Sequence, residues 1–323
     1  MIVVTGGAGF IGSAVVTRLN ELGYEHIIIV DRLGTKEKWK NLNGLKFMDV
    51  HHKDDFYKML VDDAVPFAME TVIHLGACSS TCEADADYLT QNNFRYSAEL
   101  VKHCLPRRAH FIYASSAATY GDGSLGYDDT HDITELRPLN MYGYSKHMFD
   151  VWAQKMEIDR KIAGLKFFNV YGPNEYHKED MRSVVHKAYE QILATGELKL
   201  FKSDHPDYAD GEQKRDFIYV KDAVEMIMHF NENRDKGGLF NVGTGKARSW
   251  NDLAKAVFDA MGKPVNIKYI DMPEQLKGKY QYFTEAKVDK IKEAGYTKEL
   301  CSLEDGVKDY IQNYLMKTKY LGL

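Results

Sequence analysis

The feature that most constrains this chain is a cluster of glycines near its N-terminus, within residues 3–12. Gly6, Gly9 and Gly12 follow a short β-branched run and precede an amphipathic stretch, so the sequence predicts a strand, a tight turn and a helix. Glycines at this spacing allow the backbone to approach a pyrophosphate, and the N–H groups at the start of the helix can bind the anion. The alternative is a glycine-rich turn without a ligand, but the position directly after the first strand favours a dinucleotide site.

Strand-like and helical segments alternate along the chain. The predicted strands are 2–4, 27–30, 45–50, 71–75, 110–114, 165–170, 216–220 and 239–242. The predicted helices are 11–22, 54–61, 88–104, 142–163, 181–194 and one after each of Ser249 and Ser302. Such alternation implies a parallel sheet with right-handed crossovers. The predicted fold class is therefore α/β, a Rossmann-type doubly wound parallel sheet with a smaller, discontinuous C-terminal α/β substrate domain.

The domain boundaries follow from this pattern. Residues 1–169, with 216–245 returning to them, are expected to form the dinucleotide-binding domain. Residues 170–215 and 246–323 are expected to form the substrate-binding domain, which includes a polar loop over 202–213.

Composition excludes several classes of protein. The 323 residues carry 42 basic and 47 acidic side chains, a net charge of −5, so the basic excess that nucleic-acid binding requires is missing. Neither a signal peptide nor an apolar run of about 18 residues is visible, which predicts a cytoplasmic protein without a membrane partner. Cys78, Cys82, Cys104 and Cys301 lack the spacing of a disulfide framework or a zinc site, so we expect free, mostly buried thiols and no metal.

The end of the second predicted strand bears on the choice of dinucleotide. Asp31 stands where an acid would bind the adenosine ribose hydroxyls of NAD. Arg32, Lys36, Lys38 and Lys53 could instead supply positive charge to the 2′-phosphate of NADP. From these residues alone, NAD and NADP both remain open.

A tyrosine and a lysine predict the chemistry. Tyr142 and Lys146 lie four residues apart and therefore on one helix face. An ammonium beside a phenol favours the phenolate, which makes the tyrosine available as a general base, and the same lysine can hold the nicotinamide ribose. Ser116 follows the fifth strand, at the edge of the sheet where ligands bind, and its hydroxyl can share a substrate proton. A chance pair on a helix surface and a serine that caps a turn are the alternative readings.

With these residues in this order, the whole chain resembles the extended short-chain dehydrogenase/reductase family, whose members modify sugar nucleotides. Within that family it is similar to members that act on an ADP-heptose. The segments that carry this closer resemblance are 76–81, 113–121, 142–146, 168–173, 177–178, 214–217, 241–245 and 276–281.

The resemblance implies an activity. It implies that C6″ of ADP-D-glycero-β-D-manno-heptose is inverted to the L-glycero epimer through transient oxidation and re-reduction with tightly bound NADP, for the inner core of lipopolysaccharide. The two faces of the intermediate ketone require two bases, which the resemblance assigns to Tyr142 and Lys178. It also implies a homo-oligomer, specifically a pentamer.

The resemblance assigns further residues to each ligand. Cofactor contacts are expected from Gly6, Gly9, Phe10, Ile11, Gly12, Asp31, Arg32, Lys38, Lys53, Leu75, Gly76, Ala77, Cys78, Ser79, Asn92, Lys146, Val170 and Lys178. Substrate contacts are expected from Ser116, Asn169, Asp180, Lys187, Phe201, Lys202, Ser203, Asp204, Arg215 and Tyr280. Arg215 suits a pyrophosphate because guanidinium binds it in a bidentate manner, and a structural ion pair with Asp216 or a neighbour is the alternative. Asp180 and Lys187 depart from the small and imidazole side chains usual in the family.

Three other functions compete with this one. A UDP-hexose 4-epimerase would share Ser116, Tyr142 and Lys146, but Lys178 argues against it. A dehydratase needs an acid pair after the serine, where this chain has two alanines. A dinucleotide-sensing binding protein without catalysis would not need the tyrosine and the lysines.

Overall fold

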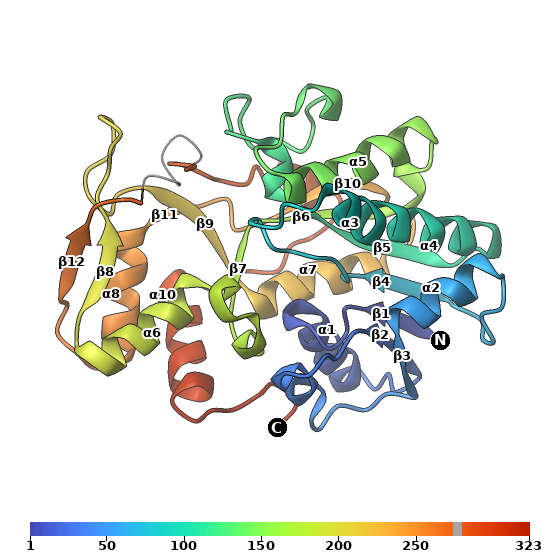
Figure 1. Ribbon diagram of the computed structural model, residues 1–323, viewed down its shortest axis with the longest axis horizontal. Coiled ribbons are helices and arrows are strands. Elements are labelled where there is room, and N and C mark those ends of the chain that lie inside the picture. Colours follow the sequence, from blue (N-terminus) through green and yellow to red (C-terminus); the bar gives the residue numbers. More distant parts are fainter. Residues whose placement is uncertain (274–279) are drawn as a thin grey trace.

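The computed structural model describes residues 1–273 and 280–323, and its centre is a parallel sheet of seven strands (Figure 1). In sheet order the strands are β10 (Gly238–Val242), β6 (Ala163–Phe167), β5 (His110–Ser116), β4 (Thr71–His74), β1 (Ile2–Thr5), β2 (Ile27–Asp31) and β3 (Asp49–His52). The strand order reverses direction at β1, which confirms the predicted doubly wound sheet.

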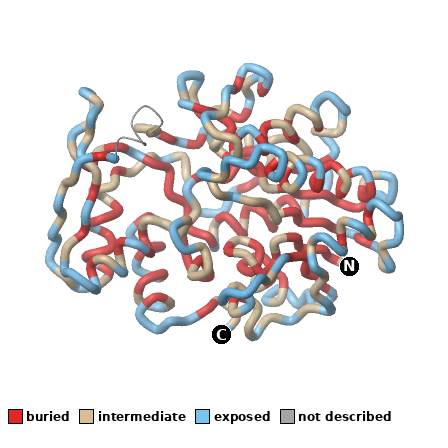
Figure 2. Tube along the Cα trace, in the orientation of Figure 1, coloured by how far each residue is buried: buried red, intermediate tan, exposed pale blue. Residues whose placement is uncertain are grey.

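The strands are apolar on both faces because helices cover both. Val4 belongs to the hydrophobic cluster on one side of the sheet and Val3 to the cluster on the other, and Ile29 and Ile28 alternate in the same way. In Figure 1, α1 and α7 lie on one side and α2, α4 and α5 on the other. Figure 2 accordingly shows the central strands as the most continuously buried part of the chain.

The helices divide between the sheet and the C-terminal part. Those that cover the sheet are α1 (Phe10–Glu21), α2 (Lys53–Val61), α3 (Ala86–Leu89), α4 (Tyr96–Cys104), α5 (Met141–Lys155) and α7 (Val220–Glu232). The others are α6 (Val184–Thr195), α8 (Trp250–Ala260), α9 (Asp289–Glu293) and α10 (Leu303–Asp309). A π-helical turn, η2 (Thr90–Arg95), joins α3 to α4 within the helix predicted over 88–104.

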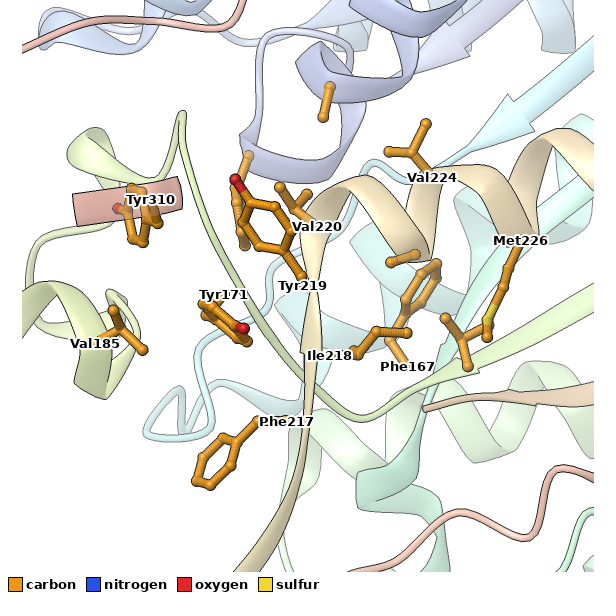
Figure 3. Packing of buried hydrophobic residues seen from close by; sticks show 14 of the residues in the cluster. Phe167, Tyr171, Val185, Phe217, Ile218, Tyr219, Val220, Val224, Met226 and Tyr310 are labelled. Carbon is orange, nitrogen blue, oxygen red and sulfur yellow. The ribbon is translucent and has the colours of Figure 1, made fainter. Parts of the chain in front are cut away.

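Two small sheets lie beyond the large one. One has the order β11 (Ala247–Ser249), β9 (Lys214–Tyr219) and β7 (Asn169–Tyr171), and the other pairs β12 (Ile267–Ile270) with β8 (Leu198–Phe201). The segment 216–245 is therefore shared, because β9 lies in a small sheet while β10 lies in the large one. In Figure 3, Ile218 of β9 points towards Phe167, whereas Phe217 points the opposite way.

The helix predicted over 142–163 is eight residues too long. α5 ends at Lys155, and Glu157 has a left-handed backbone with φ of 55°. Apolar residues continue past this turn because Ile162 is buried where the chain enters β6, the strand next to the β10 edge of the sheet. The prediction therefore read a strand's apolar residues as another turn of helix.

Three other boundaries also differ from prediction. The strand expected over 165–170 is divided, since Phe168 leaves the large sheet and β7 joins a small one. The helix expected from residue 181 begins at Val184, because Ser183 caps it by accepting a hydrogen bond from the N–H of His186. The strand expected over 45–50 is displaced to β3, Asp49–His52.

The four cysteines are free, as predicted, but only Cys104 is buried. Cys82 is exposed, and Cys78 and Cys301 are half-buried, so the expectation of mostly buried thiols is wrong. In the described part of the chain, none of the helices has the length and apolar character needed to cross a membrane.

Candidate active site

A cavity of about 1070 Å³ opens at the carboxyl ends of the parallel strands. All of the residues predicted to contact the cofactor line it, from Gly6 in the first turn to Lys178 beyond the large sheet. Ser116, Tyr142 and Asn169 line the same cavity. The fold therefore gathers residues from most of the chain into one site large enough for a dinucleotide and part of a second ligand.

The turn after β1 needs its glycines for steric reasons. Gly6 has a φ of 68°, and a Cβ on Gly12 would lie 2.0 Å from the carbonyl oxygen of Gly6. Gly9 is the N-cap of α1, and among the described residues no side-chain cap accepts a hydrogen bond from the N–H groups at the start of this helix. These N–H groups face the ligand side and fit a pyrophosphate.

Replacing Gly12 by Ala is expected to disrupt this turn. The clash with the Gly6 carbonyl should cost about 1–3 kcal/mol of unfolding free energy or more and should abolish retention of the dinucleotide during purification. Thermal melting and the ratio of bound dinucleotide to protein measure the two effects. Gly262→Ala is the control, because it has a φ of 65° but no heavy atom within 4 Å, so only its melting temperature should fall.

The adenosine end of the cavity is basic, and its acid is neutralised. The carboxylate of Asp31 accepts hydrogen bonds from the N–H of Ala8 (2.9 Å) and of Arg32 (2.7 Å), and it forms an ion pair with Lys38. Lys53 pairs with Asp54, and Lys36 pairs with Glu179. Within the described residues the guanidinium of Arg32 has no hydrogen bond or ion pair, so it is the cation of this group that is free to meet an anion.

The three residues expected to act on the substrate lie together. Ser116 ends β5, where its hydroxyl accepts a hydrogen bond from the N–H of Ala118 (3.1 Å), so it also caps the turn. Burial raises the pKa of Tyr142, and a hydrogen bond with the Ser116 side chain opposes that rise. Tyr142 and Lys146 share one face of α5, whose N-cap is Asn140.

Lys146 is buried, and its pKa is lowered. Its Nζ donates a hydrogen bond to the carbonyl of Ala114 (2.8 Å). Burial lowers the pKa of Lys146 to about 8, against the attraction of Asp150, which favours the ammonium. Its charge is therefore sensitive to small changes in the surroundings near neutral pH.

Lys178 reaches the same cavity from the opposite segment. It lies in η7 (Tyr176–Met181), and its Nζ is 5.4 Å from the centre of the Phe10 ring. Burial lowers the pKa of Lys178, and the charge of Glu175 opposes this effect. Glu175 is itself fixed by Ser183, whose hydroxyl donates to its carboxylate (2.6 Å). Burial thus makes Lys178 easier to deprotonate than an exposed lysine.

Asn93 was not predicted from the sequence. This buried residue lies in the π-helical turn η2, a local geometry that often occurs at functional sites. Its side chain accepts from the N–H of Cys78 (2.9 Å) and donates to the carbonyl of Cys78 (2.9 Å) and to Ser145 (2.9 Å). Ser145 donates in turn to the carbonyl of Tyr142 (2.7 Å). Asn93 thus joins the cofactor-side loop to the catalytic helix.

The residues expected to contact substrate fall into separate groups. Arg215 lies over the rings of Tyr280 and Trp250, at 5.0 and 5.7 Å from their centres, and donates to backbone carbonyls of Lys214 and Gln281. It does not pair with Asp216 in the described structure, where the Asp216 carboxylate accepts backbone N–H groups such as that of Thr244. The described residues therefore do not support an ion pair of Arg215 with Asp216.

Of the expected substrate contacts, Ser116 and Asn169 line the cavity, whereas Arg215, Tyr280 and the remaining ones do not. Asp180 and Lys187 are exposed, and the Nζ of Lys187 donates to the backbone carbonyl of Asp180. Phe201, Lys202, Ser203 and Asp204 lie at the end of β8, where Lys202 pairs with Asp271 (2.9 Å) and Asp204 accepts from Tyr282. Of the motif at 276–281, residues 276–279 lie outside the described residues.

Comparisons with known proteins agree with this geometry. Residues 2–243 match the NAD dependent epimerase/dehydratase family. The ADP-L-glycero-D-manno-heptose-6-epimerase of Nitratidesulfovibrio vulgaris is 58% identical over 98% of each chain. The crystal structure of the Helicobacter pylori ADP-L-glycero-D-manno-heptose-6-epimerase has a TM-score of 0.79 at 27% identity, covering 97% of this chain and 95% of that one. The UDP-glucose 4-epimerase of Thermotoga maritima has a TM-score of 0.80 at 28% identity, covering 98% and 99%. The chain belongs to the NAD dependent epimerase/dehydratase family.

Proposed function

We propose that this enzyme inverts C6″ of ADP-D-glycero-β-D-manno-heptose to the L-glycero epimer, using tightly bound NADP, and so supplies heptose for the lipopolysaccharide inner core. The observation that carries the proposal is that Lys178 lines the same cavity as Tyr142, Lys146 and Ser116, because inversion requires a proton-transfer group for each face of the sugar carbon. The identity to relatives named for this reaction supports it.

An NAD(P) cofactor fits the residues present. The glycine turn and the uncapped start of α1 would hold the pyrophosphate, and Lys146 would hold the nicotinamide ribose. When bound, the nicotinamide supplies reversible oxidation of the sugar carbon. We assign NADP over NAD because Asp31 is already occupied by Lys38 and two N–H groups, while Arg32 is unpaired among the described residues.

Arg32→Ala should therefore weaken the binding of NADP selectively. Loss of one charge-assisted contact costs about 1.5–3 kcal/mol, so the Kd for NADP should rise about 10–100-fold while the Kd for NAD changes little. Equilibrium titration of the dinucleotide-free protein with each cofactor measures both values. Arg160→Ala, at an exposed arginine away from the cavity, is the control, and an equal rise for NAD would show that Arg32 does not read the 2′-phosphate.

Tyr142 and its neighbours would serve one face of C6″. The ammonium of Lys146 favours the phenolate of Tyr142, so the oxygen can accept the proton of the 6″-hydroxyl. Ser116 would donate a hydrogen bond to the same oxygen of the sugar and steady it during the transfer.

Lys178 would serve the other face. When Tyr142 accepts the proton, Lys178 starts as the ammonium, which the charge of Glu175 favours. After the ketone has rotated in the site, Lys178 protonates the oxygen, which then lies on the side of this lysine. In the reverse direction Lys178 is the base, and burial favours the neutral amine that accepts the proton. Two groups with opposite starting protonation suit a reaction that runs in both directions.

Arg215 and Tyr280 would hold the ADP part of the substrate. A guanidinium over aromatic rings can bind a diphosphate while an adjacent ring packs against the base. The proposed domains follow the same division, with 1–169 and the returning part of 216–245 for the dinucleotide and 170–215 with 246–323 for the sugar nucleotide. We further propose a cytoplasmic homo-oligomer, specifically a pentamer, which analytical ultracentrifugation would test.

The experiment is to incubate the purified protein with ADP-D-glycero-β-D-manno-heptose and to resolve the products by chromatography. Conversion to a mixture of the two C6″ epimers is expected. UDP-glucose, assayed under the same conditions for conversion at C4, is the comparison. Turnover of UDP-glucose in place of ADP-heptose would make the chain a UDP-hexose 4-epimerase, and turnover of neither with a dinucleotide bound would leave a binding protein.

A further inference from the structure

A pair of oppositely charged side chains is buried between α5 and β6. Asp150 of α5 and Lys166 of β6 are 1% and 0% exposed, and Asp150 Oδ2 lies 3.4 Å from Lys166 Nζ. Neither residue lines the cavity described above. Burying such a pair has a large desolvation cost, and apolar residues of similar size would often stabilise a fold equally well. Stability alone therefore does not account for the pair.

Neighbouring side chains give both residues polar contacts. The carboxylate of Asp150 accepts hydrogen bonds from the hydroxyls of Tyr113 (2.9 Å) and Ser115 (2.6 Å). The ammonium of Lys166 donates to the hydroxyl of Thr119 (2.6 Å) and lies 4.7 Å from the centre of the Tyr120 ring. These contacts favour the ionised forms, so Asp150 brings a negative charge into the space behind the site.

Asp150 is placed to act on Lys146. The two residues are four positions apart on α5, one turn of the helix, and so lie on the same face. Lys146 Nζ is held by a neutral acceptor, the carbonyl of Ala114, and burial works against its charge. Asp150 is the formal negative charge that favours the ammonium of Lys146.

We propose that Asp150 is a positioning residue for the reaction, which holds Lys146 as an ammonium through the helix turn between them, and that Lys166 and the two hydroxyls hold Asp150 in the ionised form for this purpose. The inference rests on the proposed function, since it assigns Asp150 a role through a lysine of that site.

The other groups around Lys146 do not supply this charge. His74 of β4 is buried between Thr5 and Ser97, and burial lowers its pKa to about 3, so it is neutral. Among the described residues, Tyr142 of the same helix and Cys78 after β4 also lie near Lys146, but neither is a carboxylate. Asp150 is thus the residue whose removal should change the charge of Lys146 most.

The test is the pH dependence of two properties in Asp150→Asn, namely kcat and the affinity for NADP. Loss of a nearby opposite charge should move the alkaline limb of both profiles by about one pH unit towards lower pH. At a pH above the alkaline limbs of wild type and variant, kcat of the variant should then be about tenfold lower. The double variant Asp150→Asn with Lys166→Met leaves no unpaired buried charge, so it should fold if the single variant does not, and it should show a shift in the same direction.

Tyr113→Phe is the matched control. It removes one hydrogen bond to Asp150 but no charge, so it should lower the melting temperature without moving either alkaline limb. If the Asp150 variants melt earlier but keep the wild-type limbs, the pair is structural and the inference is wrong. If wild type binds NADP but does not epimerise ADP-heptose, the proposed function fails, and the limb of the NADP affinity profile alone decides the inference.

Discussion

Replacing Tyr142 by Phe is expected to lower kcat for C6″ epimerisation by about 10²–10⁴-fold, the usual contribution of a positioned general acid–base group. The phenyl ring keeps the packing of α5 but removes the oxygen that lies with Ser116 in the cavity. Binding of the dinucleotide should persist, because the glycine turn and the basic adenosine end are untouched. Epimer ratios measured over time, together with dinucleotide content, report both properties.

Tyr144→Phe is the matched control for this prediction. Tyr144 lies two residues further along α5, is 49% exposed and does not line the cavity, so its variant should retain wild-type kcat. A Tyr142→Phe protein within about threefold of wild type would exclude the tyrosine as a proton-transfer group, since that change is far below the expected range.

Replacing Lys178 by Met should have a comparable effect on kcat, about 10²–10⁴-fold, because the second face of C6″ loses its proton-transfer group. Methionine is unbranched like lysine and only one atom shorter, so it can still pack against Phe10 and the loss should come from chemistry more than from folding. Rates of conversion from each epimer, measured separately, together with melting temperature, distinguish the two causes.

Lys255→Met serves as the control for Lys178, because Lys255 is an exposed lysine of α8 outside the cavity. Full epimerisation by the Lys178→Met protein would mean that one group, or water, serves both faces. In that case the assignment of Lys178 would be wrong even if the substrate is correct.

The large sheet could be predicted because its signals are local. The β-branched runs before Gly6 and up to Asp31 are buried on both faces in parallel strands, and the glycines between β1 and α1 are required by close backbone contacts. The end of α5 could not be predicted, because Ile162 continues the apolar spacing of the helix while it belongs to the next strand. Apolar periodicity does not reveal where the chain reverses.

The site was predictable to different degrees. The cofactor side follows motifs close in sequence, and its expected residues all line one cavity. Asn93 could not be found, since its role depends on a π-helical turn that brings Cys78 and Ser145 to its side chain. Asp180 and Lys187 were expected to face substrate but are exposed, and the Nζ of Lys187 donates to the backbone carbonyl of Asp180. Long-range contacts of this kind leave no local pattern.

The most direct test of the account uses ADP-D-glycero-β-D-manno-heptose with deuterium at C6″, converted by the purified protein in ordinary water and analysed by NMR. The account predicts an inverted C6″ that keeps its deuterium, since the hydrogen removed from the carbon returns to the same carbon without exchange with water. Inversion with loss of the deuterium to solvent would show deprotonation of carbon in place of oxidation, and it would contradict the proposed mechanism.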